Sequence, residues 1–140
     1  MAPPFVKKLK EVVLTVGGNS WQCQTESVTL ENNTDDPDQA FTLCPDGEYY
    51  EEPDPSYALV FTALADWRAN GLSRWLTQND SSTATFTYVL HPDDVASTVY
   101  WTGSVRIKAP NAGGDGRATE KQEITLQVLG KPNFFTGAPA

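Results

Sequence analysis

The sequence has few of the residues with which most enzymes and metalloproteins do their chemistry. Its 140 residues include one histidine, His91, and two cysteines, Cys23 and Cys44. His91 stands before a proline in a turn-like string, whereas a catalytic histidine needs a nucleophile or an orienting acid held beside it. No Cys/His spacing in the chain suits zinc. We therefore predict a protein that is not an enzyme and that uses no cofactor and no metal ion.

Long hydrophobic runs are also missing. No segment approaches the roughly 20 consecutive apolar residues of a membrane-spanning helix, and no apolar stretch follows the opening string MAPPFVKKLK. We therefore expect no membrane partner and a soluble protein that is made in the cytoplasm. Disulfides are rare in that reducing compartment, so we predict that Cys23 and Cys44 are free thiols buried in the core.

Basic residues are absent from one long stretch of an already acidic chain. The formal net charge is -8, and no lysine or arginine occurs between Lys10 and Arg68. Such a chain is unsuited to gripping nucleic acid, because that requires neutralising phosphates. The simplest interpretation of this stretch is a solvated, solubilising loop, and a contact surface for a partner is the alternative. Its acids are Glu11, Glu26, Glu31, Asp35, Asp36, Asp38, Asp46, Glu48, Glu51, Glu52, Asp54 and Asp66.

What the chain does have is a period of two in its apolar residues, which indicates β-strands. Ten prolines and ten glycines add many turns, and the length of 140 residues fits one domain. We predict a mainly β domain that begins with a hairpin, in which residues 9–16 and 21–30 flank a turn at Gly17-Gly18-Asn19. Further strands are expected at residues 56–64, 84–90, 100–108 and 124–129. The periodic positions of Trp75 and Trp101 favour packing in the core.

One stretch departs from this pattern. In residues 65–80, ADWRANGLSRWLTQND, the apolar spacing becomes helical. Leu72, Trp75, Leu76 and Asn79 fall on one face at positions i, i+3, i+4 and i+7, while Arg74 and Gln78 point away. We predict one short amphipathic helix that lies against the sheet.

Three segments show no clear period. Residues 1–8 read as an extended arm, and residues 130–140 as a polar C-terminal segment. Residues 32–55 contain four prolines and most of the acids of the stretch without basic residues, with only residues 40–44 resembling a brief strand. Loops this long inside a compact domain are commonly functional or ordered by a partner. The string Gly113-Gly114-Asp115-Gly116 is interpreted as a hairpin turn, because no Lys-Ser/Thr follows to make a phosphate loop.

Several sites receive only weak support. The acids at Asp35, Asp36 and Asp38 lack the spacing of a calcium loop. The neighbours Glu51 and Glu52 lack the opposed geometry that glycoside hydrolysis requires, so an acidic hydrolase rests on carboxylate abundance alone. A carbohydrate-binding module that stacks sugars on Trp67 and on Tyr49 or Tyr50 is a more concrete alternative.

Three strings carry a resemblance to a known family. They are the helix Gly71-Leu72-Ser73-Arg74-Trp75-Leu76, the strand Trp101-Thr102-Gly103 and the Gly113-Gly114-Asp115 loop before the last strand. With the order of segments from Leu9 to about Pro132, they resemble the major tail (tail tube) protein of long-tailed, siphovirus-type bacteriophages, especially those that infect actinobacteria. A tail terminator of the same fold is the related alternative.

The resemblance implies an antiparallel β-sandwich or half-barrel with one flanking α-helix. It further implies that six copies form a ring, that rings stack into a hollow tube in the virion tail, and that genomic DNA passes through the lumen without specific binding. The implied partners are other copies of the chain, the tape measure protein, the tail terminator and baseplate proteins. An acidic wall would repel DNA instead of trapping it. The expected inter-subunit contacts are Asp35, Asp36, Asp38, Glu51, Glu52, Lys7, Lys8, Arg68 and Arg74, with Arg106 and Lys108 as further basic partners for the acids.

Overall fold

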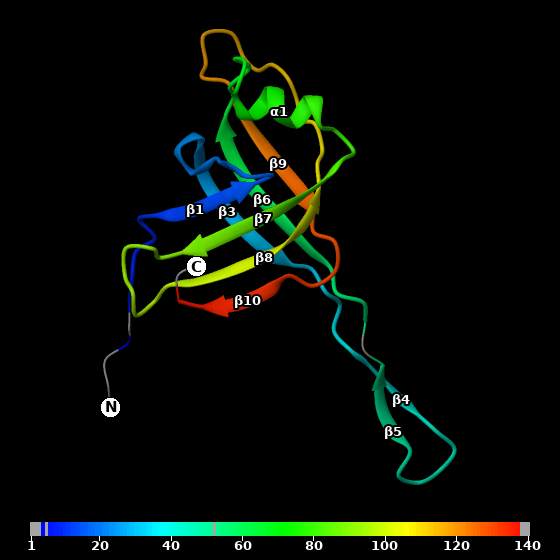
Figure 1. Cartoon of the computed structure of the whole chain (residues 1–140). Coiled ribbons are helices and arrows are strands. Elements are labelled where there is room, and N and C mark those ends of the chain that lie inside the picture. Colours follow the sequence, from blue (N-terminus) through cyan, green and yellow to red (C-terminus); the bar gives the residue numbers. More distant parts are fainter. Residues whose placement is uncertain (1–3, 5, 52, 138–140) are drawn as a thin grey trace.

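Two antiparallel sheets pack against each other in the computed structural model, which describes residues 4, 6–51 and 53–137 (Figure 1). The five-stranded sheet holds, in spatial order, β10 (Asn133–Thr136), β8 (Val99–Arg106), β7 (Thr83–Leu90), β1 (Val12–Val16) and β2 (Asn19–Ser20). The three-stranded sheet holds β3 (Thr25–Asn32), β6 (Tyr57–Leu64) and β9 (Lys121–Gln127). One α-helix, α1 (Leu72–Gln78), accompanies them. The predicted mainly β fold is confirmed.

The core lies between the inward faces of the two sheets. Leu14 and Phe86 come from the five-stranded sheet, Phe61 and Leu126 from the three-stranded one, and each is at most 2% exposed. Burying one such side chain contributes roughly 1.5–3 kcal/mol. Exposed and buried residues alternate along β9, because only one face of that strand meets the core.

The sandwich is closed along one side and open along the other. Val105 of β8 forms a bridge with Val128, and the Leu129 N–H donates to the Ser104 carbonyl at 2.8 Å, which joins the two sheets beside β8 and β9. On the opposite side, β1 and β3 belong to different sheets, and no ladder joins them in the described part of the chain. The result is the half-barrel that the resemblance implied.

The helix is shorter than the sequence predicts. It begins at Leu72 instead of residue 65, because Asp66 organises a turn before it: its carboxylate accepts the Arg68 N–H, and its carbonyl accepts the Ser73 N–H at 3.1 Å. The predicted faces are correct. Leu72 and Leu76 are buried, Trp75 is half-buried, and Arg74 and Gln78 are exposed. In Figure 1 the helix crosses the end of the sandwich at which β6 finishes.

The predicted N-terminal hairpin is wrong in its second half. β2 has only two residues, after which a 3-10 turn, η1 (Gln22–Gln24), carries the chain into the other sheet, where β3 begins. Trp21 marks this crossing: its side chain is 8% exposed and lies 5.9 Å from the ring of Trp75. A tight turn precedes it, with Gly17 at φ +61° and the Trp75 ring too close to admit a Cβ.

Three further expectations need correction. Part of the C-terminal segment 130–140 is the strand β10, which pairs with β8. The loop around Gly113 joins strands of different sheets, so it is not a hairpin turn. Cys23 and Cys44 are free as predicted, but both are exposed, because one lies in η1 and the other in a projecting turn. Trp75 and Trp101 pack against the core while remaining partly exposed.

Candidate functional site

The stretch predicted to be a long loop is a projecting β-hairpin. β4 (Asp38–Phe41) pairs with β5 (Glu48–Glu51), and Figure 1 shows the two strands pointing away from the sandwich. We call residues 35–54 the finger, of which Glu52 lies outside the described residues. The expected brief strand at residues 40–44 is therefore shifted to Asp38–Phe41, and β5 was missed. A six-residue turn closes the finger through a Thr42 N–H to Gly47 carbonyl bond.

The base of the finger is continuous with the body. The finger leaves the sandwich where Asn32 of β3 pairs with Tyr57 of β6. Beyond that pair, the Asn33 N–H donates to the Ser56 carbonyl at 2.7 Å, and the Ser56 N–H donates to the Thr34 hydroxyl at 2.9 Å. The two ends of the finger are thus held side by side, which fixes where it emerges from the body.

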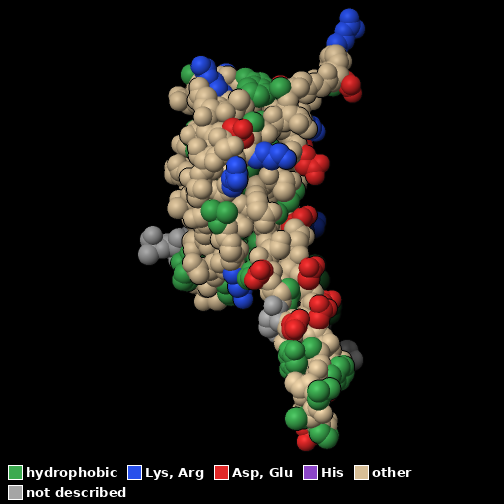
Figure 2. Space-filling model, turned by 90° about the vertical axis from the view of Figure 1, so that its right-hand side faces the viewer, with side chains coloured by type: hydrophobic (Ala, Val, Ile, Leu, Met, Phe, Trp, Pro, Cys, Tyr) green, Lys and Arg blue, Asp and Glu red, His purple; other side chains and the backbone are tan. Residues whose placement is uncertain are grey.

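Large apolar side chains lie uncovered on the finger. Phe41 is 71% exposed, Leu43 is fully exposed, and Tyr49 and Tyr50 are also exposed. Figure 2 shows hydrophobic side chains along the finger and acidic ones gathered toward its base. A two-stranded hairpin alone is at best marginally stable in water, and exposed apolar patches of this kind mark interaction sites. The finger therefore has the properties of a surface that a partner covers.

The other two segments without a sequence period carry exposed apolar groups as well. Val6 in the N-terminal arm and Leu9 just after it are exposed, and so are Phe134 and Phe135 on β10. Phe135 stacks on Tyr100 at 5.0 Å, and Phe134 lies 5.2 Å from Trp101. Together with the finger, these segments contain most of the exposed large hydrophobic residues in the described part of the chain.

The predicted acidic contacts all lie on or beside the finger. Asp35, Asp36, Asp38 and Glu51 are exposed, and Glu52 is outside the described residues. Among the described residues, no ion pair involves an acid of the finger. These carboxylates are free to meet basic groups of another chain.

The predicted basic contacts do not meet the finger within one subunit. Lys7 pairs with Asp93 at 3.2 Å, and this hydrogen bond lowers the pKa of Asp93. Arg68 pairs with Asp66 at 2.9 Å, where its hydrogen bonds hold the pKa of Asp66 below its ordinary value. Lys8 and Arg74 are exposed. Lys7 and Arg68 therefore have partners inside the chain, whereas Lys8 and Arg74 point to solvent.

The aromatic residues of the carbohydrate-binding alternative do not form one platform. Trp67 follows the end of β6 that adjoins α1, while Tyr49 and Tyr50 lie in the finger, beyond the other end of β6. The Trp67 ring N–H also donates to the Glu120 carboxylate at 3.2 Å. A sugar could not stack on Trp67 and the tyrosines of one subunit at the same time.

The structure adds a buried polar contact that the sequence reading missed. Ser73 of α1 is fully buried, and its hydroxyl bonds the side-chain oxygen of Gln122 while accepting the Asp66 N–H at 3.1 Å. The sequence could have indicated the burial of Gln122. Ile124 and Leu126 face the core at every second position of the strand, and residue 122 is the preceding position on the same face. The contact ties the helix to β9 and has a structural role.

Other kinds of site have little support. No group of three metal-binding side chains occurs among the described residues, and no described helix has the length and hydropathy to cross a membrane. His91 occupies a turn with φ 53°, and its carbonyl accepts the Thr98 hydroxyl. The projecting, uncovered finger is thus the principal candidate for function.

Comparison with known proteins identifies the fold. No known protein family and no curated protein sequence matches this chain. Among solved structures, the sheath/tube terminator of the extracellular contractile injection system PVC, in its extended state, superposes with a TM-score of 0.63 and 17% identity over 96% of this chain and 100% of that one. A chain of the PVC sheath-tube complex in the extended state gives 0.59 and 15% identity, over 89% and 88% of the two chains. At these identities the similarity is one of fold: the chain has the fold of these two components of a contractile injection system.

Proposed function

We propose that this protein is a structural component of a phage tail or a phage-tail-like particle, and that it assembles with copies of itself into rings. The observation that carries the proposal is the finger, with Phe41, Leu43, Tyr49 and Tyr50 exposed on a hairpin that no other described segment of the subunit covers. The shared fold with a sheath/tube terminator and with a sheath-tube complex chain supports it.

In its finer form, the proposal is a tail tube subunit, as the sequence resemblance implies. Six copies would form each ring, and stacked rings would enclose a lumen through which DNA passes in a virion. The tape measure protein, the tail terminator and baseplate proteins would be its neighbours in the tail. The net charge of -8 supports this role, because an acidic tube resists phosphate binding.

A tail terminator is the second candidate, and a specific observation favours it. The chain superposes on all of the PVC sheath/tube terminator with the higher of the two TM-scores, 0.63. The two candidates differ in how far assembly proceeds: a tube subunit adds ring upon ring, whereas a terminator closes one end and stops.

Electron microscopy of the purified protein across a concentration series tests both. Long hollow tubes are expected of a tube subunit, and single rings of a terminator. Purified protein that stays monomeric at high concentration, together with its absence from isolated tail particles, would overturn the proposal.

A further inference from the structure

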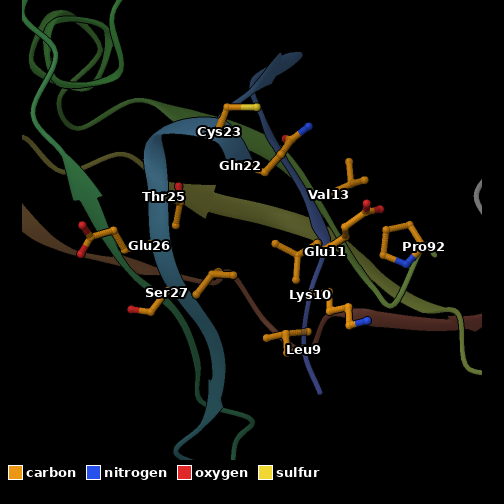
Figure 3. Close-up of a pocket in the computed structure, with 12 residues that line it drawn as sticks. Leu9, Lys10, Glu11, Val13, Gln22, Cys23, Thr25, Glu26, Ser27 and Pro92 are labelled. Carbon is orange, nitrogen blue, oxygen red and sulfur yellow. The ribbon is translucent and has the colours of Figure 1, made fainter. Parts of the chain in front are cut away.

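The open side of the half-barrel contains a groove. Its walls come from residues 9–13, which lead into and begin β1, and from η1 with the first half of β3; its volume is about 480 Å³. Figure 3 shows Cys23 at one end of this groove and Leu9 at the other. Val12, Val13, Val28 and Pro92 give it an apolar lining. We call it the seam groove.

Among the described residues, the wall formed by β1 has an unused hydrogen-bonding edge. Leu14 directs its backbone groups away from β7, because its carbonyl accepts the Trp21 N–H at 2.9 Å and its N–H faces the Gln22 side chain. Val12, two residues earlier, presents its N–H and carbonyl to the same side. β2 ends before it reaches this position, since it pairs only with Thr15 and Val16. Free strand edges beside apolar grooves are surfaces to which extended segments bind.

The finger tip is the part of this chain that suits such a groove. Leu43 is fully exposed at the tip, with Phe41 71% exposed at the end of β4. Roughly 300–1,000 Å³ is enough to enclose a small ligand, so the seam groove has room for a leucine and part of a phenylalanine. The turn that holds Leu43, from Thr42 to Gly47, is preformed by its own backbone hydrogen bonds.

A finger cannot reach the seam groove of its own subunit. The groove borders the start of β3, at Thr25 to Val28, whereas the finger leaves from the far end of β3, after Asn32. Asn32 lies four positions beyond Val28 along the strand, a distance of about 13 Å, and the finger points away from the body (Figure 1). The occupant must come from another molecule.

The charges of the two surfaces are complementary. The finger has acids and no basic residue, whereas Lys10 lines the seam groove and Lys8 immediately precedes Leu9, which also lines it. Lys8 and Lys10 are exposed. Of the two acids that line the groove, Glu26 is paired with Lys121 at 3.2 Å and Glu11 is exposed. Opposite charges at the rim steer and orient a second copy.

We propose that the finger tip of one copy, with Leu43 and Phe41, seats in the seam groove of a second copy. The inference rests on the self-assembly proposed above and names the surfaces through which it occurs. Where each groove receives the finger of a different copy, the contact is heterologous and propagates into a ring or a helical stack. It also places one exposed cysteine from each copy at the same interface, Cys44 from the finger and Cys23 from the groove.

Two single-cysteine variants test the contact. Cys23→Ser retains only Cys44, and Cys44→Ser retains only Cys23. When the two variants are mixed and treated with a short bismaleimide, which adds one thiol to each of its double bonds, a covalent dimer is expected. Neither variant alone should give that dimer. A dimer from Cys23→Ser alone would mean that tips meet tips, and would overturn the proposal.

Substitutions at the tip and in the groove complete the test. Leu43→Asp, or Ser27→Arg in the groove, should lower the yield of the mixed dimer at least about tenfold, the change expected when one buried leucine is withdrawn from an interface. Leu129→Asp, at an exposed leucine outside both surfaces, serves as the matched control and should leave the yield unchanged. Circular dichroism establishes that each variant is folded.

Electron microscopy of the same samples separates this inference from the proposed function. Rings or tubes without the mixed dimer would overturn the docking of the tip in the seam groove and leave the structural role standing. Absence of rings, tubes and dimers together would overturn both.

Discussion

The sandwich body and the finger are built from the same element, an antiparallel pair of strands, yet different forces hold them. In the body each strand buries a face, so that Phe61 and Leu126 are almost completely excluded from water. In the finger both faces of the hairpin meet solvent, and its four-residue strands bury nothing large. We therefore expect the body to be stable by itself and the finger to gain stability when another molecule covers it.

Removal of the finger is the strongest test of this division. Replacing residues 35–54 with a short glycine linker should abolish assembly completely, because the exposed apolar side chains are lost. The body should keep its free energy of unfolding within about 1 kcal/mol, since Thr34 and Ser56 already lie side by side and a shorter loop costs less entropy to close. Electron microscopy and urea unfolding measure the two effects. A deletion variant that still forms rings would show that the finger is dispensable.

Two phenylalanines allow a matched comparison of the regions. Phe61→Ala should lower the free energy of unfolding by about 3–5 kcal/mol, because it opens a cavity in the core. Phe41→Ala, at a side chain that is 71% exposed, should change it by no more than about 0.5 kcal/mol. Urea titrations of the monomer give both values. Equal effects at the two positions would mean that the finger packs on the body in solution.

A polar contact in the body should show an intermediate effect. Ser73→Ala leaves the Gln122 oxygen and the Asp66 N–H without their bonds to the hydroxyl, at a cost of about 1–3 kcal/mol. Gln78→Ala, on the exposed face of α1, is the control and should stay within about 0.5 kcal/mol. Thermal unfolding at fixed pH distinguishes the two. A neutral Ser73→Ala would indicate that water replaces the hydroxyl.

The smallest effect is expected at the surface ion pair between Arg68 and Asp66. Hydrogen bonds from Arg68 hold the pKa of Asp66 below its ordinary value in the folded state. A lowered pKa contributes stability above the unfolded value, and this contribution is lost as the pH falls through the folded value. Because the pair is exposed and screened by solvent, the change in stability is small. An NMR titration should show the Asp66 pKa rising in Arg68→Gln; an unchanged pKa would show that the pair does not form in solution.

The same division explains what the sequence could reveal. β6, β7 and β8 were predicted to within two residues of their observed bounds and β9 to within three, because apolar residues that face the core recur at every second position. β5 and β10 were missed, because all their residues are exposed and no period of two is imposed on them. The helix was extended too far back, because residues 65–70 resemble helix in composition while Asp66 uses its carboxylate to hold a turn.

The candidate site was predicted as a location but not as a shape. The prolines and acids of residues 32–55 pointed to this segment, but the projecting hairpin within it was not predicted. The pairing of β4 with β5, in which Ala40 lies opposite Tyr49, imposes no alternation of apolar and polar residues on the sequence. The seam groove was equally hidden. It exists because β2 stops after two residues, which depends on how Trp21 packs against Trp75.

The attachment of the finger has a mechanical consequence. Both strands at its base run straight into the three-stranded sheet, where β6 is the central strand and pairs with β9 from Ala58 to Leu64. A pulling force on the finger acts along these strands. It therefore loads all the hydrogen-bonded pairs between β6 and β9 in shear at the same time, instead of separating them one after another. Tension applied at the tip of one subunit is thereby distributed over the core of the sandwich. The projecting hairpin is anchored in the part of the protein with the greatest resistance to mechanical unfolding.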